Sequence, residues 1–105
     1  MGKRPKEEHL HYLYHLLAEI HDPADIAALL DDVCTRKEVE NMAERICAAR
    51  LLLAGKTYNQ VMDEATISSA TLSRVSRCVQ YGNGYSRLLI PLDPETPESP
   101  AGSEP

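Results

Sequence analysis

The 105-residue sequence has no tryptophan and no phenylalanine, and its aromatic side chains are five tyrosines. A core without the two largest apolar residues has to be built from aliphatic side chains, and one domain of this length buries a modest core. No apolar run approaches the roughly 18 residues that a membrane-spanning helix needs. The basic start MGKRPK is followed by EEHLHY, so it does not form a secretory signal. We therefore expect a soluble, cytoplasmic protein with no membrane partner.

Patterns that would indicate chemistry are also missing. Cys34, Cys47 and Cys78 include no C-x-x-C pair, which predicts buried, reduced thiols rather than a disulfide framework. No serine or cysteine is paired with a suitable histidine and acid, and no glycine-rich phosphate loop occurs, so an enzyme is not expected. His11 and His15 share a helical face, but further ligands for a metal ion are lacking. The sequence predicts neither a metal site nor a cofactor.

Negative charge is concentrated at the C-terminal end of the chain. The net charge is −5, but residues 91–105 hold four of the 16 acids and no base, so the first ninety residues carry 11 basic and 12 acidic side chains. From residue 65 to residue 90 there is no acid, while Arg74, Arg77 and Arg87 are present. Contact with phosphate depends on the charges that meet the nucleic-acid backbone, not on the net charge. The chain therefore has a local basic segment that suits nucleic acid.

Helical spacing dominates the first half of the sequence. Apolar residues three and four apart predict helices over residues 7–21, 24–33 and 36–54. Asp22 closes the first of these, and Pro23 suits the first turn of the second. No segment shows the alternation of a β-strand, so the sequence predicts an all-α fold.

The third helix has clear boundaries and an unusually apolar end. Thr35 with Glu38 forms a capping box at its start, and Gly55 stops it. The leucines at positions 51 to 53 are too many for one buried stripe, so either two neighbouring elements or a second subunit flank this helix. The residues expected to face inward are Val39, Met42, Ala43, Ile46, Ala49, Leu52 and Leu53.

Residues 57–82 predict two short capped helices that meet at a tight turn. Thr57 with Gln60 forms a second capping box, Ser68 caps the next helix, and Gly82 marks its end. The side chains of the second helix that lie outside its apolar seam are small at the start of the helix and basic further along. This pattern suits the major groove of DNA. The expected seam is Val61, Ala65, Ile67, Leu72, Val75 and Val79, and the opposite face is Ser69, Ala70, Thr71, Ser73, Arg74 and Arg77.

The C-terminal end predicts one more short helix, with Tyr85, Leu88 and Leu89 inward and Pro91 at its end. The sequence beyond is acidic and proline-rich, a composition that predicts disorder. The predicted division is a flexible basic N-terminus (1–6), an all-helical domain (7–90) with its helix pair at 57–82, and a disordered acidic tail (91–105).

The segments AGKTYNQV and ATLSRVSRCVQYG, within Thr35 to Gly82, resemble the Trp repressor family, most closely its TrpR-related YerC/YecD-type branch. The resemblance covers about half of the chain. It implies an all-α, intertwined homodimer in which a helix-turn-helix places one recognition helix of each subunit in the major groove of double-stranded DNA. It also implies that Ser69, Ala70 and Thr71 meet the bases. The residues expected at the DNA backbone are Ser68, Ser73, Arg74, Ser76 and Arg77.

The resemblance further implies a candidate effector pocket, and it shows two departures. Arg45, Arg74 and Thr35 match positions that hold tryptophan in the responsive members. Val75 stands where those members have glycine and would fill the space of an indole, so we expect no response to tryptophan. Thr66 stands where the family has glycine in the turn, so either a positive φ costs on the order of 1 kcal/mol or the turn has another conformation.

Together these patterns predict a sequence-specific, duplex-DNA-binding transcriptional regulator, and a protein that occupies a promoter usually represses it. The alternative is a helical protein–protein interaction module whose arginine face meets an acidic partner. The target operator, the identity of any small-molecule effector and the direction of regulation are not encoded in these patterns.

Overall fold

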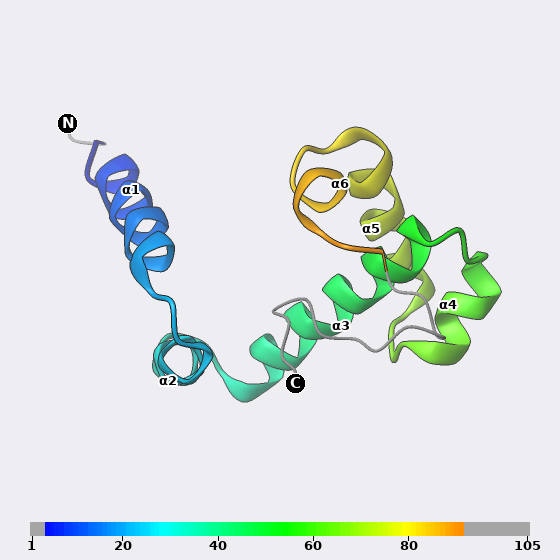
Figure 1. The fold of residues 1–105 in the computed structure, drawn as a ribbon, viewed down its shortest axis with the longest axis horizontal. Helices are drawn as coiled ribbons and strands as arrows, with labels where there is room; N and C mark the ends of the chain where they lie inside the picture. Colours follow the sequence, from blue (N-terminus) through cyan, green and yellow to red (C-terminus); the bar gives the residue numbers. More distant parts are fainter. Residues whose placement is uncertain (1–3, 92–105) are drawn as a thin grey trace. The chain divides into compact units, whose positions relative to one another are not determined.

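The computed structural model describes residues 4–91, and these form six helices and no strand (Figure 1). The predicted all-α fold is therefore confirmed. Two compact units divide the chain, one up to Val39 and the other from Glu40 onward. Within the described part, no helix is both long and apolar enough to cross a bilayer. The helices are α1 (Arg4–Glu19), α2 (Pro23–Val33), α3 (Arg36–Leu53), α4 (Tyr58–Glu64), α5 (Ser69–Tyr81) and α6 (Tyr85–Leu88).

The helix boundaries of the N-terminal unit follow the predicted caps. Asp22 caps α2, and its Oδ1 atom accepts a hydrogen bond from the Ala24 N–H at 3.0 Å. Thr35 and Glu38 form the predicted reciprocal capping box, with donor–acceptor distances of 2.8 and 3.1 Å. α1 begins at Arg4, three residues before the predicted start of this helix. The predicted tail from residue 92 onward lies outside the described residues.

The N-terminal unit leaves its apolar side chains exposed. From residue 6 to residue 39 the structure has no fully buried side chain. On α1, Leu10, Leu13 and Leu17 are each more than a third exposed, and Val33 at the end of α2 is 65% exposed. These helices therefore have amphipathic surfaces without an apolar core of their own.

The C-terminal unit has a small aliphatic core beneath α4 and α5. It is formed by fully or almost fully buried side chains, and Ile67, Val79, Tyr85 and Leu89 pack against it. The predicted seam of the helix pair is thereby confirmed. The buried residues are Ala48, Ala49, Leu51, Val61, Ala65, Leu72 and Val75.

Four apolar residues expected to face inward are exposed: Met42, Ala43 and Ile46 on α3 and Leu88 on α6. Met42 and Ile46 on α3 are 36% and 43% exposed, because the core of this unit contacts the later stripe of the helix, which contains Ala48 and Leu51. Leu88 on α6 is also exposed, since Tyr85 and Leu89 are the residues that pack against the core from this short helix. The spacing of apolar residues predicted the apolar side of each helix. It does not show which part of that side the neighbouring helices cover.

Two glycines end helices for different physical reasons. Gly55, after α3, has a φ of +93°, in the left-handed region that other residues rarely adopt. Gly82, at the C-cap of α5, has ordinary extended backbone. A Cβ atom at this position would lie 2.7 Å from the Cys78 carbonyl oxygen, so the position requires glycine because of close approach. Both predicted helix ends are confirmed.

Candidate nucleic-acid interface

Short-range hydrogen bonds define the helix pair of α4 and α5. Thr57 and Gln60 form the predicted capping box at the start of α4, with distances of 2.9 and 3.2 Å. Ser68 caps α5, and its Oγ atom accepts a hydrogen bond from the Thr71 N–H at 3.2 Å. These caps satisfy N–H groups that a helix leaves unpaired at its first turn. The two helices therefore begin where the sequence predicts.

The turn between the helices does not need a glycine. In the described chain, no residue other than glycine has a positive φ, and Thr66 is no exception. Of the two alternatives for Thr66, the one with a strained left-handed residue is wrong and the one with another turn conformation is confirmed. The Thr66 N–H instead donates a hydrogen bond to Oε1 of Glu44 on α3, at 3.0 Å.

One face of α5 is exposed and basic. Ala70, Arg74, Arg77 and Tyr81 follow each other at spacings of four, three and four, so they lie on one side of the helix. All four are exposed, and Tyr81 is 80% exposed. Neither arginine forms an ion pair with any residue in the described range. Their guanidinium groups are therefore available to an anionic partner.

The start of α5 presents small polar side chains. Ser69 and Ala70 are exposed, while Thr71 is half-buried. The Ser68 hydroxyl donates a hydrogen bond to Oγ1 of Thr71 at 3.1 Å. Thr71 thus accepts from its neighbour and keeps its own hydroxyl hydrogen for another acceptor. The helix N-terminus adds partial positive charge at the same place.

The predicted backbone contacts differ in accessibility. Ser68, Ser73, Arg74 and Arg77 are exposed. Ser76 is 7% exposed, because it lies one turn after Leu72 on the buried side of α5, and its Oγ atom accepts a hydrogen bond from Nε2 of Gln80 at 3.3 Å. Ser76 is therefore not available to a phosphate group in this structure.

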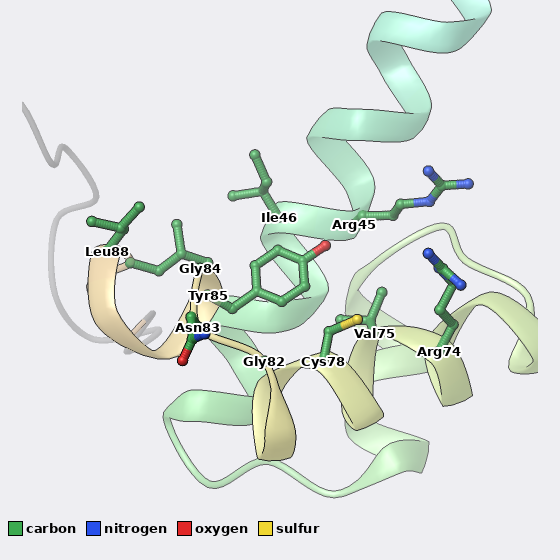
Figure 2. A pocket seen from close by; sticks show the side chains of 11 residues that line it. Arg45, Ile46, Arg74, Val75, Cys78, Gly82, Asn83, Gly84, Tyr85 and Leu88 are labelled. Carbon is green, nitrogen blue, oxygen red and sulfur yellow. The ribbon is translucent and has the colours of Figure 1, made fainter. Parts of the chain in front are cut away.

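A hollow of about 500 Å³ lies beside α5, between α3 and α6 (Figure 2). Arg45 and Arg74 lie at one end of it, with Val75 and Cys78 along the side formed by α5 and Tyr85 opposite. Val75 is 1% exposed, so its side chain belongs both to the core and to the wall of the hollow. Thr35, the other residue predicted for an effector pocket, lies in the N-terminal unit and caps α3.

The remaining candidate groups are the histidines of α1 and the three cysteines. The rings of His11 and His15 lie 4.3 Å apart, but no set of three or more His, Cys, Asp or Glu side chains in the described residues is arranged to hold a metal ion. Cys34, Cys47 and Cys78 are half-buried thiols, where the sequence predicted buried ones. The absence of a metal or cofactor stays a prediction.

A capped helix pair with an apolar seam on one side and an exposed basic helix face on the other is typical of the helix-turn-helix class of DNA-binding proteins. Comparison with protein families agrees with this class. Residues 8–90 match the family model described as Trp repressor protein. The chain belongs to the Trp repressor family, whose members are DNA-binding regulators of transcription.

Two similar proteins support this assignment. The chain is 34% identical over 87 residues to the uncharacterized protein YerC of Bacillus subtilis (strain 168), covering 83% of this chain and 84% of YerC. The fold matches a crystal structure of a Staphylococcus aureus protein described as a candidate Trp repressor, with a TM-score of 0.72 and 27% sequence identity. That match covers 81% of this chain and 89% of the other. The predicted family and its YerC-type branch are confirmed.

Proposed function

We propose that this protein is a sequence-specific repressor of transcription that binds duplex DNA as a homodimer, with α5 as the helix that enters the major groove. The observation that carries the proposal is the exposed face of α5, on which Arg74 and Arg77 have no acidic partner within residues 4–91. Two unpaired guanidinium groups three residues apart can contact successive phosphates, because both project from the same side of the helix.

Base recognition in this proposal comes from the first turn of α5. Ser69 can donate or accept a hydrogen bond, and the methyl group of Ala70 can pack on a thymine methyl. Thr71 accepts from Ser68 and therefore acts as a donor, which suits a purine N7 or a thymine O4. Ser73 is close enough in sequence to add a hydroxyl contact to a flanking phosphate, whereas a phosphate contact from Ser68 would replace its hydrogen bond to Thr71.

The homodimer is supported by the exposed apolar surfaces. With 11 residues, α2 is too short to be stable alone in water, and α1 with 16 also needs its apolar side covered for most of its stability. Residues 6–39 contain no fully buried side chain, while Leu13, Leu17 and Val33 are exposed. A second copy of the chain supplies the missing cover and places two α5 helices for half-sites about 34 Å apart.

The proposed regulator does not have tryptophan as its effector. The Val75 side chain lies in the wall of the hollow, between its arginine end and its Tyr85 side, where it restricts a planar ring. Arg45 and Arg74 would hold the anionic group of any small-molecule effector that the hollow admits. The identity of such an effector does not follow from the side chains.

The test begins with selection of bound fragments from the genomic DNA of the source organism. A mobility-shift assay at low salt then compares the wild type with Arg74→Ala and Arg77→Ala, which should both bind more weakly. Lys37→Ala is the matched control, since it removes an exposed positive charge from the first turn of α3. A Thr71→Ala change should alter the preferred sequence while leaving non-specific affinity intact.

Repression is tested separately with a reporter gene behind a selected fragment. Expression should fall when the wild-type protein is present and recover with Arg77→Ala. No duplex binding at any salt concentration would overturn the proposal and favour a helical interaction module with an acidic partner.

A further inference from the structure

A carboxylate from α3 reaches the turn of the helix pair. Oε1 of Glu44 accepts the hydrogen bond from the Thr66 N–H at 3.0 Å, and the two residues are 22 positions apart in the sequence. Glu44 is half-buried, whereas Thr66 is exposed. The hydrogen bond therefore connects the helix that supports the core with the backbone that precedes α5.

Glu44 has an unusual position for an acidic residue. It lies one turn before Ala48 and two turns before Leu51, so it belongs to the stripe of α3 that faces the core. Ala48 and Leu51 are fully buried. An acid at the edge of such a stripe loses hydration, and this loss is offset when the carboxylate accepts a hydrogen bond.

The Thr66 N–H is the first amide after α4 that has no partner in the helix ladder. The Ala65 N–H closes α4 by donating to the Val61 carbonyl at 2.8 Å, and the Leu72 N–H opens α5 by donating to the Ser68 carbonyl at 2.9 Å. Thr66 lies between the last helical hydrogen bond of α4 and the first one of α5. Its amide is held by a side chain from a third helix instead.

The space between α3 and the turn is not filled by apolar packing. A polar hollow of about 230 Å³ lies there, and its lining includes Asn41, Glu44, Thr66 and Ser68. Ile67 is the neighbouring residue that packs against the core. Two attachments therefore hold the turn, the apolar one at Ile67 and the hydrogen-bonded one at Thr66.

We propose that Glu44 is a positioning residue for DNA recognition: its carboxylate fixes the turn, and through the turn the first residues of α5, so the sequence preference of the protein depends on it. Thr66 precedes Ser69 by three residues, and a shift of the turn moves the whole first turn of α5. The inference rests on the proposed function, because it concerns the residues that would meet the bases.

The two possible roles of Glu44, as a hydrogen-bond acceptor and as a negative charge, predict opposite effects of its substitution on DNA binding. If Glu44 acted only as a negative charge near DNA, both Glu44→Gln and Glu44→Ala would bind duplex DNA more tightly, since each removes a repulsion. If it acts as an acceptor, Glu44→Gln keeps a side-chain oxygen at the same reach and Glu44→Ala does not. Rescue by glutamine therefore separates the two roles.

The experiment has two measurements. Amide hydrogen exchange on the DNA-free protein should be about tenfold faster at Thr66 in Glu44→Ala and unchanged in Glu44→Gln. Affinity is then measured for a duplex selected from genomic fragments and for a scrambled duplex of equal length. The ratio of the two affinities should fall about five- to tenfold in Glu44→Ala and stay within about twofold of the wild type in Glu44→Gln. Glu64→Ala, which removes an exposed carboxylate at the end of α4, should leave both measurements unchanged.

Three results would overturn the inference: unchanged Thr66 exchange in Glu44→Ala, an unchanged affinity ratio in Glu44→Ala, or equal losses in both Glu44 variants. If Glu44→Ala does not fold by circular dichroism, Glu44→Met, which keeps the side-chain volume without an oxygen, takes its place. Exchange at Thr66 needs no DNA, so a wild-type protein that binds no duplex refutes the proposed function while the Glu44 hydrogen bond is still judged by exchange.

Discussion

Removal of the Arg77 guanidinium tests the DNA-binding face most directly. Arg77 is exposed and lies opposite the buried side of α5, which carries Leu72 and Val75. Arg77→Ala should therefore leave the fold intact, because substitutions at exposed positions away from such packing usually change stability by no more than about 0.5 kcal/mol. The expected effect is on DNA affinity and on its dependence on salt.

The magnitude follows from counting phosphate contacts. A dimer brings two copies each of Arg74 and Arg77, and each phosphate contact contributes about −0.9 to the slope of log affinity against log salt. These four contacts give a slope of about −3.6, so raising the salt from 50 to 200 mM weakens binding about 150-fold. Arg77→Ala removes two contacts, which halves the slope to about −1.8 and reduces the loss over the same range to about 12-fold. The slopes differ by about 1.8, so if the two proteins bind equally at about 1 M salt, the variant should bind about 60-fold more weakly than the wild type at about 100 mM.

Fluorescence anisotropy of a labelled, selected duplex at several salt concentrations gives both quantities. Lys37→Ala should have the affinity and slope of the wild type, and circular dichroism should show equal helicity for all three proteins. A variant that binds more weakly with an unchanged slope would refute the assignment of Arg77 to phosphate. An unchanged affinity would refute the assignment of this face to DNA.

Three further predictions concern the dimer, the effector and a helix end. Leu13→Asp should convert the dimer to a monomer in size-exclusion chromatography with light scattering, whereas Tyr12→Asp, on the other side of α1, should not; a wild-type monomer would contradict the dimer. Calorimetry with L-tryptophan should give no heat beyond dilution, and saturable micromolar binding would show that Val75 leaves room for the indole. Gly82→Ala should lower the free energy of unfolding by about 1–3 kcal/mol in chemical denaturation, because its Cβ atom meets the Cys78 carbonyl. Gly84→Ala has open space around it, and a similar loss there would contradict this cause.

The helix pair shows how far local patterns reach. Thr57 with Gln60, and Ser68 with its helix, were predictable because a cap and its partner are separated by three residues. The buried seam also followed from spacing, since side chains three and four apart share one side of a helix. Ser76 could have been assigned to the buried side by the same rule, because it lies one turn after Leu72.

The outcome at Thr66 could not be predicted in this way. Its partner is 22 residues earlier, on another helix, and the sequence around Glu44 contains no cap or turn signal that would indicate it. The position of Glu44 four residues before Ala48 is a weak signal, because Ala48 and Leu51, which follow it at helical spacing, are both apolar. Only the packing of α3 against the helix pair shows which backbone group the carboxylate reaches.

The sequence alone determined the all-α class, the caps and ends of the helices, the seam of the helix pair and the resemblance to the Trp repressor family. These properties depend on contacts within one or two helical turns, which a linear pattern records. The tertiary structure decided which apolar residues of α3 enter the core, that Ser76 is buried, and that Glu44 holds the turn before α5. Those properties depend on how far neighbouring helices reach and on groups that are distant in sequence, and such contacts exist only after the helices have packed.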